Sequence, residues 1–520
     1  MEPAYDYVVI GSGFGGSVSA HRLTEKGYRV LVLEKGKRWD PSRFPKTNWQ
    51  LRKWLWLPLF RFHGFFKLTL LPHVSVLSGV GVGGGSLVYA NTLPRPAKPF
   101  YERGNWAGLA DWEKELAPHY EEGERMLGAT ENPRLFDSDL TLRSVARGLG
   151  REESFEPTRV AVFFGEPEKE VPDPYFQGQG PARTGCTHCG ACMTGCRFGA
   201  KNTLDKNYLY LAERGGAEVR AGQKVRSIRP LDGKHGSTGY EIDVISSTKL
   251  FRKRSKVRCR GIVLAGGVLG TVRLLLDMKS TQLPGLSDRV GDHIRTNNES
   301  LLLVHSRQKE KEFSKGVAIG SLFAPDEDSH IEPVRYGKGS GFWKLLAVPM
   351  GKGGNLANRL AQIGGHLLRR PGSWLRIFVS RDFANSSVIL LYMQHLDSTL
   401  RLHRGAVNLR TRLARGDRPT AFMPGATRLA RETANEVDGQ AFVMATEAIT
   451  ARPTTAHILG GCVMGEDART GVIDRDHRVF GYENFLICDG SAVSANPGVN
   501  PALTITALTE RAMAKVPRKK

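Results

Sequence analysis

The sequence predicts an α/β (α+β) protein, in which a doubly wound, Rossmann-type parallel sheet is interrupted by an inserted domain with a mixed sheet. Three observations lead to this prediction. Residues 5–34 read as strand, glycine turn, helix and strand, the first unit of a doubly wound sheet. Residues 261–276 (GIVLAGGVLGTVRLLL) repeat the strand–glycine–helix pattern. Residues 300–450 carry strand patterns of their own before the chain returns to a glycine-rich C-terminal stretch.

The first unit begins almost at the N-terminus. Residues 5–10 (YDYVVI) read as a buried strand, 14–27 as a helix and 29–34 (RVLVLE) as the next strand. The basic run at 252–260 is expected to be a solvated face or a hairpin. The remaining patterns predict, in order, a glycine-rich loop at 77–93, a helix at 109–128, a loop-rich stretch at 129–185, helical character at 201–214, strands at 217–228, 240–247 and 257–265, and a final helix at 502–515.

Composition limits the class of protein. The chain has 520 residues, 40% of them hydrophobic and 24% charged, so it is globular and long enough for two joined domains. Its net charge of +22 fits either an anionic partner or a simply basic surface. No RNA-binding motif, zinc finger or helix-turn-helix pattern accompanies this charge, so we expect no nucleic-acid partner.

The N-terminal residues do not read as a targeting segment. MEPAYDYVVIGSG enters a strand at once, without the regions of a signal peptide or a twin-arginine motif. No run of about 18 uncharged apolar residues occurs, so no transmembrane helix is expected. We therefore expect a cytoplasmic protein, which can still be peripheral at the membrane.

A dinucleotide fingerprint follows the first strand directly. Its residues at the entry to a helix are Gly11, Gly13, Phe14, Gly15 and Gly16. Gly11 allows a tight turn, Gly13 lets the backbone approach a pyrophosphate, and Gly16 lets the helix pack close to the strand. Glu34 ends the next strand, where its carboxylate can accept hydrogen bonds from ribose hydroxyls. The motif predicts a bound dinucleotide, and its place at the N-terminus favours FAD over NAD.

A second glycine loop, SGVGVGGGS (78–86), precedes the sequence LVYAN. Glycines leave bare backbone against which an isoalloxazine or a pyrophosphate can lie. A flexible loop is the alternative, but such loops are seldom flanked by strand-forming residues such as Leu87 and Val88. The cofactor contacts expected here are Gly81, Gly84, Gly85, Tyr89 and Asn91.

The C-terminal stretch carries two candidate catalytic groups. His457 precedes a glycine pair, Gly490 follows a strand, and Asn500 stands just before the last helix. A histidine can take the hydroxyl proton of an alcohol while hydride leaves the carbinol carbon for flavin N5. The amide of Asn500 can hold the substrate oxygen in place. Together these residues favour alcohol oxidation over a purely structural role.

These motifs resemble the glucose–methanol–choline (GMC) oxidoreductase family and, within it, the bacterial cholesterol oxidases. The resemblance implies a GMC fold with FAD, with His457 and Asn500 as the catalytic pair. It also implies flavin contacts at Gly81 to Gly85, Val225, Gly490 and Asn500. The matching segments run nearly from end to end: the fingerprint with Glu34, SGVGVGGGSLVYAN, KNTLDKNYLYLAE (201–213), VLAGGVLGTVRLLL (263–276), HILGGC (457–462) and DGSAVSANPGVNPALTITAL (489–508).

Glu332 is the third catalytic candidate. In the enzymes that the sequence resembles, a glutamate moves a proton when the steroid double bond is isomerised. Glu332, in HIEPVRYGKG, is the best match by position and context. The alternative is a surface glutamate without a catalytic role.

Four cysteines have ferredoxin-like spacing, Cys-x2-Cys-x2-Cys-x3-Cys. They are Cys186, Cys189, Cys192 and Cys196. Four close thiolates can hold an iron–sulfur cluster or a tetrahedral zinc ion. The alternatives are a loop without metal or one held by redox-active disulfides. An iron–sulfur cluster would make the enzyme a dehydrogenase that feeds an acceptor other than O₂.

Two segments have the composition of a membrane-surface contact. Residues 51–71 combine tryptophans and phenylalanines with Arg and Lys, and residues 355–370 place leucines at helical spacing beside arginines. A core-facing helix is the alternative for the second segment. Contact with an anionic lipid surface would suit an enzyme that draws a hydrophobic alcohol from a membrane.

Because the two halves interleave, we expect five segments. The cofactor half comprises 1–50, 201–298 and 452–520, and the substrate-binding half comprises 299–451. Residues 51–200 form a lid with the flavin-contact loop 77–93 and the cysteine loop 186–196.

The leading hypothesis is FAD-dependent oxidation of a hydrophobic secondary alcohol, the 3β-hydroxyl of cholesterol or a related sterol. The product is the 3-ketone, O₂ is the acceptor, and isomerisation to the 4-en-3-one can follow. One alternative is an acceptor-dependent GMC dehydrogenase of other lipid or long-chain alcohols. The other is a non-catalytic flavin- and lipid-binding redox protein.

Overall fold

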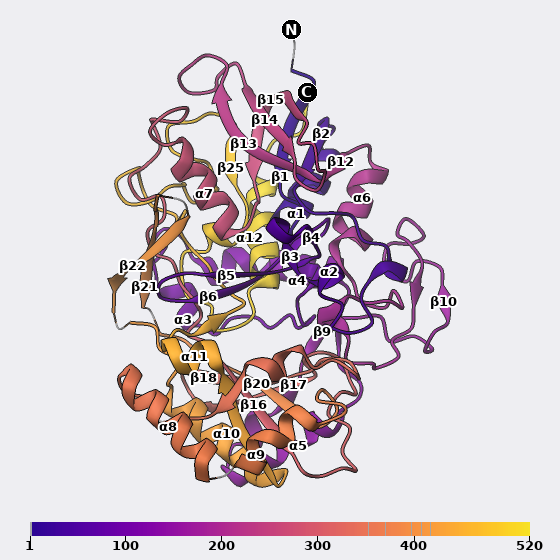
Figure 1. Cartoon of the computed structure of the whole chain (residues 1–520). Helices are drawn as coiled ribbons and strands as arrows, with labels where there is room; N and C mark the ends of the chain where they lie inside the picture. The colour runs from indigo at the N-terminus through magenta and orange to yellow at the C-terminus, as the bar shows by residue number, and fades with distance from the viewer. Residues whose placement is uncertain (1–2, 352, 370, 397, 407, 417) are drawn as a thin grey trace.

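The computed structural model describes residues 3–351, 353–369, 371–396, 398–406, 408–416 and 418–520. The chain forms two lobes (Figure 1). The upper lobe in that view contains the first and last helices and the parallel strands, and the lower lobe contains much of the middle of the chain. The predicted α/β fold with an inserted half is confirmed.

A seven-stranded sheet lies at the centre of the upper lobe. Its order is β12-β2-β1-β15-β14-β13, and β25 pairs with β15 beside this path. β12, β2, β1, β15 and β25 pair in parallel, whereas β13, β14 and β15 form an antiparallel meander. The basic run at 252–260 lies mostly in β15 and pairs with β14, which is the expected hairpin. The strands are β1 (Tyr5–Ile10), β2 (Val30–Glu34), β12 (Glu218–Ala221), β13 (Gln223–Pro230), β14 (Tyr240–Ser246), β15 (Arg254–Leu264) and β25 (Phe485–Ile487).

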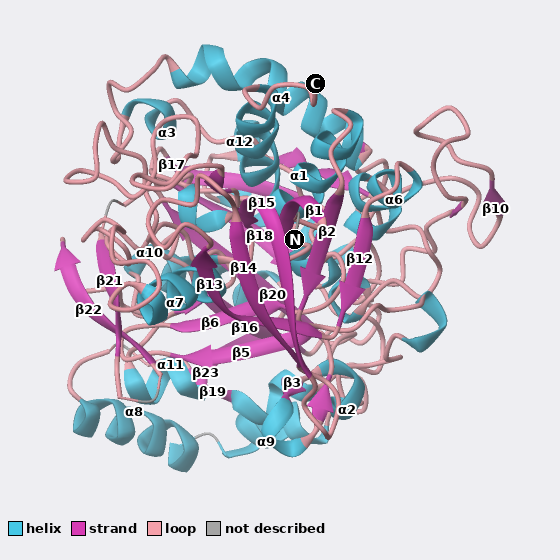
Figure 2. Cartoon of the chain, turned by 90° about the horizontal axis from the view of Figure 1, so that it is seen from above, coloured by secondary structure: helices cyan, strands magenta, loops and turns pink. Residues whose placement is uncertain are grey.

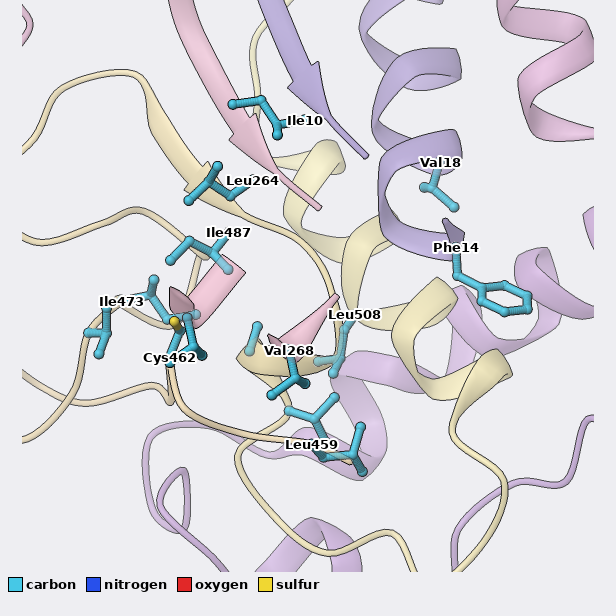
Figure 3. Packing of buried hydrophobic residues seen from close by; sticks show 14 of the residues in the cluster. Ile10, Phe14, Val18, Leu264, Val268, Leu459, Cys462, Ile473, Ile487 and Leu508 are labelled. Carbon is cyan, nitrogen blue, oxygen red and sulfur yellow. The ribbon is translucent and has the colours of Figure 1, made fainter. Parts of the chain in front are cut away.

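Helices cover this sheet and bury a common core. α1 packs against α12 and α6, and α12 also packs against α4. Figure 3 shows the core where β1, β15 and β25 end, with Ile10, Leu264 and Ile487 beside Val268 of α7 and Leu508 of α12. Each fully buried side chain of this kind contributes about 1.5–3 kcal/mol of stability, so the core holds the glycine turns at the strand ends in place. The helices are α1 (Phe14–Glu25), α4 (Trp112–Leu127), α6 (Tyr208–Arg214), α7 (Val268–Met278) and α12 (Ala502–Ala514).

A second seven-stranded sheet, of order β19-β23-β16-β20-β18-β17-β8, forms the lower lobe. Every pairing described in it is antiparallel, so this part of the fold is an antiparallel sheet and not the mixed sheet that the patterns predicted. β17 and β18 follow each other directly and pair as a hairpin, whereas neighbours such as β16 and β20 come from distant parts of the chain and also run antiparallel. The strands are β8 (Glu156–Pro157), β16 (Ser300–Ser306), β17 (Ser321–Asp326), β18 (Ser329–Val334), β19 (Ala347–Pro349), β20 (Ser387–Gln394) and β23 (Gly439–Met444).

Two helices on this sheet were not predicted. α5 (Asp137–Gly148) lies within the stretch expected to be loop-rich, and α10 (Pro424–Glu436) packs against it. α5 begins where Asp139 Oδ2 accepts a hydrogen bond from the backbone N–H of Phe136, and α10 begins with a proline in its first turn. Their apolar sides join the sheet in one buried cluster. The glycines and prolines around α5 hid its helical pattern.

The remaining elements are short. Residues 51–79 form α2, β3, β4, β5 and β6. The sequence TLRLHR, within the predicted second domain, forms β21, which pairs with β22 in a two-stranded ribbon that contacts α7. Within the described residues, we find no helix with the length and apolar character needed to cross a bilayer. The bounds are α2 (Leu51–Trp54), β3 (Trp56–Leu57), β4 (Phe62–His63), β5 (Phe66–Leu70), β6 (Ser75–Gly79), α3 (Pro99–Glu102), β7 (Ala129–Glu131), β9 (Arg159–Ala161), β10 (Glu170–Val171), β11 (Arg183–Thr184), α8 (Leu356–Arg369), α9 (Pro371–Val379), β21 (Thr399–Arg404), β22 (Leu409–Arg415), α11 (Ala445–Thr450) and β24 (Thr454–Thr455).

Candidate active site

A cavity of about 1800 Å³ is lined by residues of both lobes. The upper lobe contributes the turn after β1, the end of β2 and the entry to α7, and the lower lobe contributes β16, β18 and β20. A mixed polar and apolar cavity between two parts of a fold is where ligands most often bind. The predicted residues that line it are Gly11, Gly13, Phe14, Gly15, Glu34, Gly84, Gly85, Tyr89, Val225, His457, Gly490 and Asn500. Gly16, Gly81, Asn91 and Glu332 are not among the lining residues.

The two predicted glycine loops touch each other at the cavity wall. A Cβ on Gly84 would lie 2.5 Å from the Cα of Gly13, and a Cβ on Gly15 would lie 1.6 Å from the carbonyl oxygen of Cys488. Gly11 has φ +105°, a conformation that side-chain-bearing residues rarely adopt. Any larger residue would push the loops apart, so the glycines keep the backbone of both loops at the surface of the cavity.

Glu34 lies at the end of β2 beside the first glycine turn. Its Oε2 accepts hydrogen bonds from the Ser12 hydroxyl at 2.9 Å and the Ser12 N–H at 3.2 Å, and its Oε1 accepts one from the Gly36 N–H at 2.8 Å. These bonds hold the carboxylate against the cavity wall, where the sequence predicts a contact with ribose hydroxyls.

His457 and Asn500 are near the C-terminus, far in sequence from the N-terminal glycine fingerprint, but they line the same cavity. The Nδ1 of His457 lies 2.5 Å from Oε1 of Glu299, which begins the lower lobe just before β16. The other oxygen of Glu299 accepts a hydrogen bond from the Ala456 N–H at 2.9 Å. Burial lowers the pKa of His457, but the adjacent Glu299 carboxylate more than offsets this and leaves the pKa raised. Glu299 thus fixes the ring and favours its protonated form.

Glu332 joins this group from the middle of β18. Its Oε2 accepts a hydrogen bond of 3.2 Å from Asn500 Nδ2, and its Oε1 lies 3.6 Å from His330 Nε2. Its side chain is fully buried, so the alternative of a surface glutamate is wrong. Asn500 Oδ1 has no hydrogen-bond partner among the described residues. All three predicted catalytic residues are therefore brought together, although they are 43 to 168 positions apart.

Glu299 is the site residue that the sequence analysis missed. It sits in RTNNES, a polar run without a recognised motif, and contacts a histidine 158 residues away. The only available signal was an acidic residue at the start of an apolar strand, LLLV.

A second buried carboxyl group, that of Glu447, lies near Glu299. Burial raises the pKa of Glu447 to about 8, so Glu447 is neutral at pH 7 and adds no second charge beside Glu299.

Comparison with known proteins places the chain in a family. Models of the GMC oxidoreductase family match residues 181–287 and 380–509, and a NAD(P)-binding Rossmann-like domain matches residues 9–39. A cholesterol oxidase of Acinetobacter baumannii is 44% identical, over 99% of this chain and 95% of that protein. This chain belongs to the GMC oxidoreductase family. A cholesterol oxidase of Mycobacterium tuberculosis is also 44% identical, over 100% of this chain and 92% of that protein.

The solved GMC-type structures agree at the level of the fold. The crystal structure of pyridoxine 4-oxidase from Mesorbium loti matches with a TM-score of 0.61 and 14% identity, over 98% of each chain. Membership of the GMC family makes this chain an FAD-dependent oxidoreductase that acts on CH–OH groups.

The cavity of this GMC enzyme suits FAD. The touching glycine loops exclude side chains, and the N-terminal turn of α1 faces the cavity, which favours a pyrophosphate there. Asn91 is fully buried behind the lining, and neither its Nδ2 nor its Oδ1 has a partner among the described residues. A buried amide without a partner is costly, but Asn91 does not line the cavity, so its contact with FAD stays a prediction. The residues of the two glycine loops can thus hold FAD, which when bound supplies the hydride acceptor.

The four thiols of the cysteine loop are free: Cys186, Cys189, Cys192 and Cys196. In the part of the chain that the structure describes, no group of three or more Cys, His, Asp or Glu side chains is placed to hold a metal ion. The buried Nζ of Lys201 donates hydrogen bonds to the carbonyl oxygens of Cys192 and Tyr89, both at 2.9 Å. An iron–sulfur cluster or a zinc ion at this loop stays a prediction.

Proposed function

We propose that this GMC enzyme oxidises the 3β-hydroxyl of cholesterol or a related sterol to the 3-ketone, with O₂ as the final acceptor. The observation that carries the proposal is the contact of His457 with Glu299 beside Asn500, in a cavity that suits both FAD and a bulky apolar alcohol. The sterol is suggested by the two relatives of 44% identity, both named cholesterol oxidase. Peroxide release with cholesterol, but not with a linear long-chain alcohol, is the expected assay result. Turnover of the linear long-chain alcohol but not of cholesterol would favour an enzyme that acts on other lipid alcohols.

His457 acts as the base in this proposal. Because Glu299 holds Nδ1, the other ring nitrogen, Nε2, is the one that takes the proton of the substrate hydroxyl. The carboxylate then stabilises the imidazolium. Asn500 donates one amide hydrogen to Glu332, and its second amide hydrogen can bind the substrate oxygen. FAD, when bound, would supply the acceptor for the hydride that leaves the carbinol carbon.

Glu332 moves the proton in the isomerisation that follows. Its Oε1 has no hydrogen-bond partner among the described residues and can take a proton next to the new ketone and return it along the ring. We expect Glu332→Gln to slow formation of the 4-en-3-one by about two to four orders of magnitude, while the 5-en-3-one accumulates. Chromatography of the products and the ultraviolet absorption of the conjugated enone measure this.

Glu327→Gln is the matched control, because Glu327 is exposed on the turn between β17 and β18. This control should isomerise like the wild type. Unchanged isomerisation by Glu332→Gln would remove Glu332 from the mechanism.

We further propose that the enzyme takes its substrate from an anionic membrane surface. Leu59 and Phe60, in the turn between β3 and β4, are 87% and 66% exposed, and Trp56 of β3 and Pro58 of this turn line the cavity. The second predicted segment forms α8, on which no described side chain is fully buried: Ile363 packs against the core, whereas Leu368 is 85% exposed. In Figure 2, α8, α9, α2 and β3 lie toward the same side of the molecule, and Figure 1 shows α8 and α9 in the lower lobe with α2 and β3 above them. Arg52, Lys53 and Arg61 add positive charge near the turn.

Phe60→Asp should lower binding to vesicles of phosphatidylcholine and phosphatidylserine by about tenfold, because a charged side chain resists insertion into the apolar layer. Cosedimentation measures this, and turnover of detergent-dispersed cholesterol should stay unchanged. Phe251→Asp is the control, since Phe251 is 86% exposed at the end of the β14–β15 hairpin. Equal losses in both variants would contradict the proposed contact.

A further inference from the structure

A buried histidine, His330, faces the carboxylate of Glu332, and the mechanism described above gives it no role. The two residues lie two positions apart on β18, so their side chains point to the same face of the sheet. Nε2 of His330 lies 3.6 Å from Oε1 of Glu332, and the two side chains are 8% and 0% exposed. Neither of these two atoms has a hydrogen-bond partner among the described residues.

The neighbouring strand fixes the place of the His330 ring. His330 pairs with Met393 in the ladder of β18 and β20. The ladder continues by one residue, because the His395 N–H donates a hydrogen bond of 2.8 Å to the carbonyl oxygen of Asp328. His395 therefore lies on the same face as Met393 and diagonally beside His330. Along the sheet, His395 and Glu332 lie on opposite sides of His330.

Glu332 needs hydrogen-bond donors because burial disfavours the charged form of a carboxyl group. Glu447 shows the size of this effect in the same lobe: burial raises its pKa to about 8, although the Thr454 N–H donates to its Oε1 at 3.0 Å. Asn500 gives Glu332 one donor of the same neutral kind, at 3.2 Å from Oε2. A base must be charged to take a proton efficiently, so a second donor at Oε1 would serve the isomerisation.

We propose that His330 is a positioning residue for Glu332: its Nε2–H donates to Oε1 and keeps the carboxylate charged and aimed at the sterol ring. The inference rests on the isomerisation proposed above. The distance of 3.6 Å is longer than a hydrogen bond, but bonds of this kind often tighten when substrate is bound. Oε1 has two lone pairs, so one can accept the bond while the other takes the sterol proton.

The test supplies cholest-5-en-3-one directly to the FAD-loaded enzyme and follows the ultraviolet absorption of the conjugated enone over a range of pH. His330→Leu removes the donor, whereas His330→Gln keeps an amide donor. His305→Leu is the matched control, because His305 lies on β16 of the same sheet, outside the cavity lining, with Nδ1 at 3.0 Å from the Ser387 hydroxyl. The visible spectrum of the bound flavin reports that each variant is folded, and His330→Phe replaces a leucine variant that does not fold.

His330→Leu should lower kcat for isomerisation by about one to two orders of magnitude and leave KM unchanged. The acidic limb of its kcat profile should move to higher pH, because the carboxylate loses a group that favours its charged form. His330→Gln should restore most of both. In the described part of the chain, the titratable groups that face Glu332 are His330 and, from the upper lobe, His457, while β20 places Leu391 opposite. His457 is unchanged in every variant, so it contributes equally to each profile.

The inference is overturned if kcat and the acidic limb of His330→Leu match those of the wild type, if His305→Leu shows the same change, or if His330→Gln restores neither. Glu332→Gln in the same assay separates this inference from the proposed function. Slow isomerisation by Glu332→Gln with an unchanged His330→Leu would overturn the role of His330 alone. Isomerisation by Glu332→Gln at the wild-type rate would overturn the proposed role of Glu332 and, with it, that of His330.

Discussion

His457→Gln should slow alcohol oxidation by two to four orders of magnitude while FAD remains bound. The glutamine amide keeps much of the shape of the ring but cannot accept a proton at neutral pH. In the wild type, Glu299 holds Nδ1 at 2.5 Å and leaves Nε2 to take the proton of the hydroxyl. Stopped-flow reduction of the flavin by substrate measures the step directly, and the flavin absorbance of the purified variant reports cofactor retention.

The comparison needs a histidine outside the site. His235→Gln is this control, because His235 lies on an exposed hairpin and forms a hydrogen bond with the carbonyl oxygen of Gly481. Reduction of the flavin in His457→Gln at the rate found for the His235 variant would rule out His457 as the base.

Glu299→Gln should have the second largest effect, lowering kcat/KM by about two orders of magnitude and shifting its pH profile. The Glu299 carboxylate raises the pKa of His457, and the base must be neutral to accept a proton. With a neutral glutamine the pKa of His457 falls, so the acidic limb of the kcat/KM profile should move to lower pH even as the plateau drops. A purely structural defect would lower the plateau without moving the limb.

Glu447→Gln is the matched control for this variant. Burial raises the pKa of Glu447 to about 8, so at pH 7 the substitution replaces one neutral group with another. The acidic limb should stay in place. If Glu299→Gln left the limb unmoved or shifted it to higher pH, Glu299 would not be the residue that positions and charges His457.

Residues whose roles are local could be predicted from the sequence. The turn at Gly11, the strand VVI and the carboxylate of Glu34 fall within one βαβ unit, so spacing alone determines how they meet. His457, Asn500 and Glu332 were identified through family resemblance, and the fold brings them together.

Features set by tertiary packing could not be predicted in the same way. Glu299 contacts His457 only because the two lobes meet there, and the hydrophobic periodicity of the sequence cannot reveal such a long-range contact. The cysteine spacing predicts a metal site, but it could not show that the ammonium of Lys201 binds the carbonyl of Cys192. The antiparallel order of the second sheet depends on which strands pair, whereas hydrophobic patterns show only that strands exist.

The most direct test of the proposed function is the visible spectrum of the purified enzyme mixed with cholesterol in the absence of air. We expect the oxidised flavin bands to bleach, and to return with release of peroxide when air is admitted. Bleaching that air reverses only slowly would indicate a dehydrogenase with another acceptor. No bleaching at all would contradict the assignment of a sterol as the substrate.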